Sequence, residues 1–151
     1  MNFRFLTLSI SFIVFALNFA CSTDATSATN QKVLGTWLVL AIHNSSPSGP
    51  TLGPNTGEII SITFKNDGSF GGTTSVNTFG GQFSTTSNSL LIEELEITEV
   101  ADTNFGRAFY ESFDESRNSD TAFSEFKSVF TENNILNLEY QGFKFLTLQK
   151  Q

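Results

Sequence analysis

The chain has 151 residues, and its 15 Asp and Glu against 8 Lys and Arg give a net charge of −7. Nucleic acid is bound through Lys and Arg that displace phosphate counterions, so this acidic balance argues against a nucleic-acid partner. The length fits one domain of ordinary size. A single Cys rules out an internal disulfide, so apolar packing, to which 17 Phe contribute, must stabilise the fold unaided.

Residues 1–20 resemble a bacterial lipoprotein signal peptide. Arg4 precedes a long apolar run, and the small residue Ala20 comes directly before Cys21. Asn18 departs from the pattern, because an aliphatic residue is usual three places before such a cysteine. We expect lipidation of Cys21, with acyl chains such as palmitate, and a location in the cell envelope, at the periplasmic or outer-membrane face. Ordinary secretory cleavage and an uncleaved membrane anchor in the same segment are the alternatives, and all three place the remainder of the chain outside the cytoplasm.

Residues 21–31 are small, polar and without periodicity, which predicts a flexible tether ahead of a domain at residues 32–151. The segments Val33–Ile42 and Ile59–Phe64 are rich in β-branched and aromatic residues and predict two strands. The connection between them is long and contains all three prolines of the chain.

A meander of further strands is expected after the turn signal Asn66–Gly68, at residues 69–76 and 77–85. Residues 90–100 alternate in polarity and predict another strand. Its two faces are expected to carry, respectively, Glu94, Glu96 and Thr98, and Leu91, Glu93, Leu95 and Ile97. The glutamates are most simply a solvated face.

The periodicity becomes helical between Asp102 and Phe130. Two groups of residues at helical spacing predict two short helices or one interrupted helix: Phe105, Phe109, Tyr110 and Phe113, then Phe123, Phe126, Lys127 and Phe130. Residues 134–140 and 144–149 predict a closing hairpin. The expected fold class is α+β, a mainly antiparallel sheet that can be barrel-like, with one helical insertion before the C-terminal hairpin.

Several short motifs occur in the order and spacing of the META domain, a family of small bacterial envelope proteins that are often lipoproteins. The family pattern of G-T-W, then G-C-N-x-F-x-G-x-Y, then T-x-M-A-C is matched by Gly35, Thr36, Trp37, Asn77, Phe79, Gly81, Phe83, Thr98 and Ala101. Val76 and Asp102 stand where the family often has two cysteines, which puts any cysteine-dependent role in doubt. The resemblance implies a non-enzymatic binding domain in envelope maintenance or stress protection.

The segment Gly35–Trp37 also resembles the first strand motif of lipocalin-like lipoproteins, which implies instead a barrel that carries a small apolar ligand. An enclosed apolar cavity of several hundred Å³ favours this carrier, whereas a filled core beside an exposed groove favours a module that binds a partner. The expected partners are the membrane, through the lipid at Cys21, and an unidentified protein or small molecule.

No catalytic set is visible in the sequence. His43 is the only histidine, and neither a nucleophile nor an orienting carboxylate stands near it, so we expect no enzymatic activity and no cofactor.

One weak metal candidate remains, because oxygen-bearing residues occupy positions 1, 3, 5, 7 and 12 of a calcium-loop register. They are Asp114, Ser116, Asn118, Asp120 and Glu125. Ser119 stands where such a loop requires glycine, so a solvated loop is the favoured interpretation.

Overall fold

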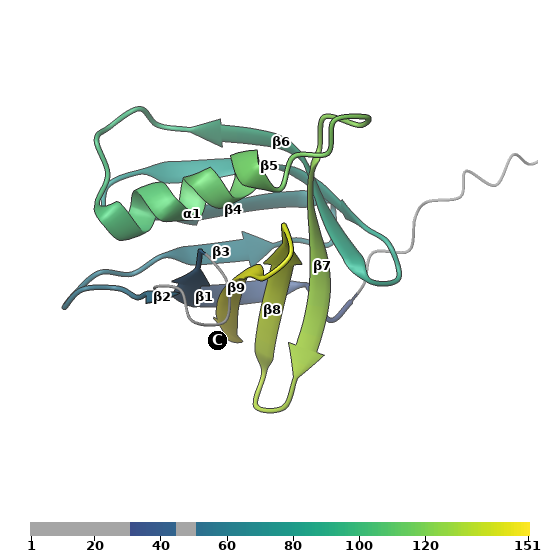
Figure 1. Ribbon diagram of the computed structural model, residues 1–151, viewed down its shortest axis with the longest axis horizontal. Coiled ribbons are helices and arrows are strands. Elements are labelled where there is room, and N and C mark those ends of the chain that lie inside the picture. The colour runs from purple at the N-terminus through teal and green to yellow at the C-terminus, as the bar shows by residue number, and fades with distance from the viewer. Residues whose placement is uncertain (1–30, 45–50) are drawn as a thin grey trace, which may run out of the picture.

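The computed structural model describes residues 31–44 and 51–151, so the predicted signal peptide, Cys21 and nearly all of the tether lie outside the described residues. Figure 1 shows β3, β4, β5 and β6 running across the view, with β7, β8 and β9 crossing them at a steep angle. In chain order the elements are β1 (Gly35–His43), β2 (Thr51–Leu52), β3 (Ser61–Phe64), β4 (Ser69–Thr73), β5 (Thr78–Thr85), β6 (Ser89–Ile97), α1 (Asn104–Glu115), β7 (Ser124–Thr131), β8 (Ile135–Tyr140) and β9 (Lys144–Lys150).

The strands form one antiparallel sheet that closes on itself, because β1 pairs with β9 as well as with β3. Trp37 lies opposite Lys150 and His43 lies opposite Phe145 at the two ends of the closing pair. The short β2 pairs only with the last two residues of β1. Within the described ranges, eight strands therefore form a closed barrel, and the predicted α+β class with a barrel-like sheet is confirmed.

Apolar side chains fill the barrel, because alternate residues of each strand point inward. Trp37 is only 1% exposed, and its indole N–H donates to the carbonyl of Val33 at 2.7 Å. Aromatic rings meet edge to face, as between Phe64 and Phe83 with centroids 4.9 Å apart. Buried strand residues include Val39, Ile42, Ile62, Phe70, Phe79, Leu90, Ile92, Phe126, Leu136, Leu138, Leu146 and Leu148.

The helix α1 packs its apolar face against this interior. Thr103 caps its N-terminus by accepting from the backbone N–H of Gly106 at 3.0 Å. Phe109 contacts Phe79 of β5 with ring centroids 5.2 Å apart, and Phe113 contacts Phe126 of β7 at 5.5 Å. The helix predicted from the first phenylalanine group is therefore confirmed, and it bridges strands on two sides of the barrel.

The expected faces of β6 are partly wrong, because Glu93 forms a β-bulge. Gln82 lies opposite Glu94 whereas its neighbour Phe83 lies opposite Ile92, which leaves Glu93 as the extra residue. The bulge reverses the alternation, so Leu90 and Ile92 point inward before it and Leu95 and Ile97 do so after it. Leu91 therefore does not share a face with Leu95.

The second predicted helix is also wrong, since residues 124–131 form the strand β7. Phe126 and Phe130 are four residues apart, a spacing that fits one face of a helix and one face of a strand equally well. The backbone of β7 pairs with both β6 and β8, and this pairing continues the sheet toward the C-terminal strands. Phe130 packs on Trp37 with ring centroids 6.3 Å apart.

Both ends of the described domain lie at one end of the barrel, beside the β3–β4 turn. Gln31 Nε2 donates to Asn66 Oδ1 at 3.5 Å. The N–H of Gln151 donates to the carbonyl of Thr36 at 2.9 Å. The β4–β5 turn, where Asn77 lies, is at the opposite end of β4.

Candidate functional site

Asn77 joins the β4–β5 turn to the segment that leaves β6. It is 2% exposed, and its amide nitrogen donates to the carbonyl of Val100 at 2.8 Å and to Asp102 Oδ2 at 2.9 Å. Its amide oxygen accepts from the N–H of Val100 and from Thr98 Oγ1, each at 3.0 Å. All four hydrogen-bonding positions of the amide are thereby used.

The carboxylate of Asp102 lies between this turn and the first turn of α1. Besides Asn77, it accepts from Thr74 Oγ1 at 2.5 Å and from the N–H of Thr103 at 2.8 Å. A Cβ at Gly106 would overlap the carboxylate, so the helix needs glycine there for this close approach. Burial would raise the pKa of Asp102, but the hydrogen bonds from Thr74, Asn77 and Thr103 outweigh it and hold the pKa below its ordinary value.

Val76, in the β4–β5 turn, and Asp102, between β6 and α1, are both linked to Thr74. Thr74 Oγ1 accepts from the N–H of Val76 at 3.3 Å and donates to Asp102. Val76 is 45% exposed, whereas Asp102 is half-buried. Hydrogen bonds through Thr74 and Asn77 therefore fasten the start of α1 to the β4–β5 turn in this chain.

A second carboxylate, that of Glu58, approaches the N-terminus of α1 from the connection between β2 and β3. A hydrogen bond from Thr103 and hydrogen bonds from the backbone and side chain of Asn55 lower the pKa of Glu58, while partial burial and the nearby charge of Asp102 act against them. The two carboxylates make this end of the barrel acidic, and the helix N-terminus favours their charge.

A groove with a volume of about 510 Å³ opens beside this cluster, between β6 and α1. Leu95 and Ile97 line it from β6, and Arg107 and Tyr110 line it from the helix. Burial raises the pKa of Tyr110, a hydrogen bond with Thr74 lowers it, and the charge of Asp102 raises it, with a net rise. The groove is open to solvent and presents partly buried apolar side chains, whereas the hydroxyl of Tyr110 is buried.

One wall of this groove is a free strand edge. The segment Ser89–Ile92 of β6 pairs with β7, whereas Glu93–Ile97 pairs only with β5 among the described strands. The N–H of Thr98 donates toward β5 at 3.1 Å. Because successive residues of an antiparallel strand direct their backbone groups to opposite sides, those of Leu95 and Ile97 face the open side.

Acidic side chains surround the edge and the groove. Glu94 and Glu96 are exposed on the outer face of β6, and Glu99 lines the groove. The basic residue on the helical wall, Arg107, donates from Nη2 to Asn104 Oδ1 at 2.6 Å. The rim along β6 is therefore negative.

His43 is held in a structural arrangement at the end of β1. Its ring stacks on Phe145 with centroids 3.9 Å apart, and Nδ1 lies 3.0 Å from Thr51 Oγ1. Nε2 lies 3.5 Å from Thr147 Oγ1. Burial lowers the pKa of His43. A catalytic histidine needs a carboxylate to orient it and a nucleophile beside it. The ring of His43 instead has two threonine hydroxyls and a phenyl ring as its neighbours.

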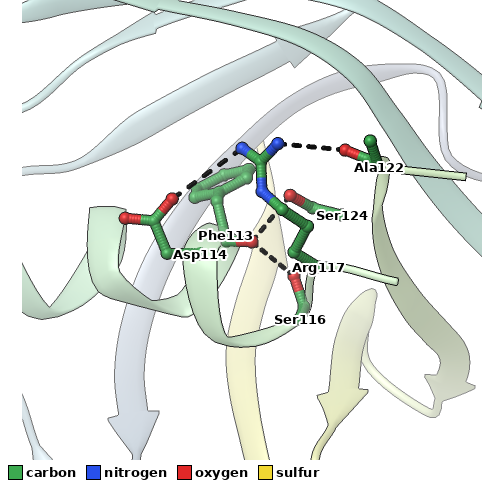
Figure 2. A network of polar contacts seen from close by, with 6 residues as sticks. All are labelled: Phe113, Asp114, Ser116, Arg117, Ala122 and Ser124. Carbon is green, nitrogen blue, oxygen red and sulfur yellow. Dashed lines mark hydrogen bonds and ion pairs between the residues drawn. The ribbon is translucent and has the colours of Figure 1, made fainter. Parts of the chain in front are cut away.

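Figure 2 shows the local contacts of two of the five calcium-loop candidates, Asp114 and Ser116. Asp114 faces the guanidinium of Arg117 at 3.9 Å, and Arg117 donates to the carbonyl of Ala122 at 3.1 Å. Ser116 Oγ donates to the carbonyl of Phe113 at 3.0 Å, as does Ser124 Oγ at 2.7 Å.

The remaining candidates of that loop are also engaged locally. Asn118 donates from Nδ2 to Glu125 Oε2 at 3.2 Å and accepts from the N–H of Asp120 at 2.9 Å. Glu125 also accepts from Ser89 at 3.2 Å. The loop links a helix to a strand and contains a cationic side chain, both unlike the helix-to-helix calcium loop that the sequence suggested.

Of the motif residues found from the sequence, Asn77, Thr98 and Ala101 line the groove, and the others lie around the core. Gly35 begins β1 at a φ of +111°, and Phe79 and Phe83 are buried in β5. A Cβ at Gly81 would collide with the backbone carbonyl of Glu94, so glycine permits the close strand approach at the bulge.

Sequence reasoning missed the groove itself. Leu95, Ile97 and Tyr110 were expected to be ordinary strand and helix residues, and no local pattern reveals that β6 loses its second partner strand. The available signal was the bulge, because two adjacent glutamates, Glu93 and Glu94, interrupt the alternation of the strand.

Across the described ranges, no group of three or more His, Cys, Asp or Glu side chains is arranged to hold a metal ion. In the same part of the chain, no helix has the length and apolar character needed to cross a membrane.

No protein-family model matches the chain, and no curated protein matches it. The fold is similar to that of a protein from Burkholderia xenovorans determined by NMR, with a TM-score of 0.58 and 16% identity over 78% of this chain and 81% of that chain. An uncharacterized protein from Bacteroides eggerthii, in a crystal structure, aligns with a TM-score of 0.45 and 16% identity over 78% of this chain and 98% of that chain. The first likeness concerns the fold alone.

Proposed function

We propose that this chain is a lipid-anchored protein of the bacterial cell envelope whose META-like barrel binds a partner in the groove between β6 and α1 and catalyses no reaction. The observation that carries the binding role is the combination of a filled barrel interior with an open groove of about 510 Å³. Binding sites commonly occupy roughly 300–1,000 Å³ and combine apolar walls with a few polar groups. Leu95, Ile97 and Tyr110 supply the apolar walls, and Glu99 and Arg107 supply polar groups.

The absence of catalysis is proposed from what surrounds the titratable groups. Asp102, with its lowered pKa, accepts hydrogen bonds that fasten α1, and His43 stacks on Phe145. The carboxylate of Asp102 and the ring of His43 are therefore already occupied by contacts within the protein, at the positions where a substrate would have to bind. A role in envelope maintenance or stress protection follows only from the META resemblance.

Anchoring is tested with Cys21→Ser in the full chain. Two or more acyl chains give stable membrane attachment, so the native chain is expected in the membrane fraction and the variant in the soluble fraction. Mass spectrometry of the mature N-terminus checks the modification directly. A variant that stays in the membrane fraction contradicts lipid anchoring and favours the uncleaved anchor.

Binding at the groove is tested by photocrosslinking in living cells. A benzophenone amino acid at position 110, inside the groove, is expected to give a discrete adduct. The same amino acid at position 143 is the matched control, because Phe143 is 65% exposed at the β8–β9 turn, away from the groove. Equal adducts from both positions, or none from position 110, contradict a binding role of the groove.

The alternative of a lipocalin-like carrier is favoured by the closed barrel but requires space inside it. A fluorescent fatty acid such as parinaric acid distinguishes the two functions. We expect no saturable uptake, because the interior is occupied by side chains such as Trp37, Phe64 and Phe126, each at most 2% exposed. Saturable binding that quenches the fluorescence of Trp37 would instead establish the carrier.

A further inference from the structure

We propose that the groove accepts an extended, basic peptide segment of a partner protein, which pairs as an added strand with the free edge of β6. This inference rests on the proposed binding function and names the class of partner. The edge Glu93–Ile97 has β5 on one side and no strand on the other within the described residues. Strand addition to such an edge is a recurrent mode of peptide recognition, in which main-chain hydrogen bonds give affinity and side-chain pockets give specificity.

The direction of the backbone groups suits this pairing. Thr98, the residue directly after Ile97, donates its N–H toward β5. Because the backbone direction alternates along the strand, Ile97 and Leu95 direct their N–H and carbonyl groups to the open side. An added strand would lie about 4.8 Å from β6, on the side away from β5. The groove lies along this edge, and its opposite wall is formed by Arg107 and Tyr110 of the helix.

Side-chain chemistry then fixes the character of the peptide. Residues that pair across two strands share a face, so peptide side chains opposite Leu95 and Ile97 would enter the groove and those opposite Glu94 and Glu96 would lie on the outer face. The groove favours apolar side chains, and the two exposed carboxylates favour Lys or Arg. The matching sequence therefore alternates apolar and basic residues.

The same carboxylates discourage other partners. Glu94 and Glu96 would face their own counterparts if two copies of this edge paired, and like charges directly opposite destabilise a sheet. Acidic peptides meet the same repulsion, to which Glu99 adds. The edge is thus open to a basic strand and protected against a second copy of this chain.

The probe is a capped peptide of about seven residues in which Lys and Val alternate, titrated into the full chain in detergent micelles. We expect the amides of Leu95 and Ile97 to shift in NMR spectra and to exchange with solvent at least about tenfold more slowly when bound, because they enter new hydrogen bonds. A peptide that alternates Glu and Val, and one with the same Lys and Val in block order, should not bind. N-methylation of alternate peptide amides should remove binding, because it blocks strand pairing.

The paired variant Glu94→Lys with Glu96→Lys should weaken binding by about tenfold or more, which corresponds to about 1.4 kcal/mol. Glu132→Lys is the charge control, since Glu132 is exposed in the β7–β8 turn, and it should change the Kd by less than about twofold. Circular dichroism checks that each variant is folded.

Three outcomes would overturn the proposal. If the Glu–Val peptide binds as well as the Lys–Val peptide, the partner class is wrong while binding at the groove, seen as adducts from position 110, survives. If no peptide binds and the lysine variants instead associate with one another, the carboxylates serve only to keep the edge unpaired. If no adduct forms at position 110 and parinaric acid binds inside, the proposed function itself fails.

Discussion

Asp102 keeps its negative charge at a point where three donors meet it: Thr74, Asn77 and the N–H of Thr103. The first two come from the β4–β5 turn and the third from the start of α1, so one side chain connects two elements that are distant in sequence. Its folded pKa lies below its ordinary value. Such a carboxylate stabilises the native state above the pKa of the unfolded chain, about 3.9, and this contribution disappears as the pH falls through the lower folded pKa.

Replacing Asp102 by Asn tests this linkage. The neutral amide keeps the shape but loses charge-assisted hydrogen bonds, so Asp102→Asn should lower the free energy of unfolding at pH 7 by about 1–3 kcal/mol. The difference from the native chain should shrink as the pH falls below about 4, where the native carboxylate becomes protonated. Urea unfolding at several pH values measures it, and a difference that stays constant or widens in acid contradicts the assignment.

For Gly106→Ala, we expect a change in the free energy of unfolding whose sign is opposite to the one that helix propensity alone predicts. Glycine in a helix interior normally costs about 0.8–1.0 kcal/mol relative to alanine, so Gly106→Ala would ordinarily stabilise α1. Here the added methyl group would overlap the carboxylate of Asp102, so we expect a loss of about 1–3 kcal/mol.

The double variant shows whether the carboxylate is the cause. With Asp102→Ala already present, Gly106→Ala should become neutral or stabilising in urea unfolding. A coupling free energy near zero between the two positions would mean that the overlap is relieved by movement.

Residue-scale features were predictable where one motif carried them. The match of Trp37 and Asn77 to short motifs was visible in the sequence, whereas the role of Asp102 was not. Its side-chain partners stand 25 and 28 positions earlier, and only the closed sheet brings them together. The sequence indicated merely that Asp102 and Val76 both depart from the family pattern.

Among the elements, β7 shows how one spacing serves two structures. Phe126 and Phe130 fit a helix or a strand, and the tertiary pairing with β6 and β8 decides the outcome. The bulge at Glu93 is a second limit, since alternation predicts a continuous strand and not the point at which its faces exchange. Apart from β2 and β7, the strands, the turn at Gly68, the helix α1 and the C-terminal hairpin were predictable, because each depends on neighbours within a few residues.

The loop between α1 and β7 carries an expectation about calcium. Arg117 lies beside Asp114 and bonds to the carbonyl of Ala122, so a positive charge already occupies the loop. A cation bound at a hundredfold excess over its Kd would add about 2.7 kcal/mol, or roughly 10 °C in melting temperature. We expect no rise specific to Ca²⁺ over Mg²⁺ at millimolar concentration by calorimetry. A calcium-specific rise that disappears in Asp114→Ala would show that the loop rearranges around the ion.

The whole molecule is closed by the pairing of β1 with β9, strands separated by about a hundred residues of chain. Such non-local closure must wait for the intervening meander, so folding in milliseconds to seconds is expected. Closure also brings residues 31 and 151 near the same place, where Lys150 Nζ lies 3.5 Å from the carbonyl of Lys32.

A circular permutant tests this arrangement. Residue 151 joined to residue 31 by about six Gly and Ser residues, with new ends between Asn133 and Asn134 in the exposed β7–β8 turn, should fold with a melting temperature within about 5 °C of the native domain. New ends placed between Gly81 and Gln82, inside β5, should prevent cooperative unfolding. Equal stability of both permutants would mean that the β5–β6 pairing does not hold the barrel together.

The hydrogen bond between Gln31 and Asn66 also sets an orientation. The chain enters the domain beside the β3–β4 turn, and the groove begins at the other end of β4, about 17 Å away along the strand (Figure 1). If the lipid proposed at Cys21 anchors the chain, the predicted tether joins the barrel at the end remote from the groove and leaves the acidic edge of β6 free to face away from the bilayer. A partner would then approach from across the compartment and would not have to displace lipid headgroups to reach β6.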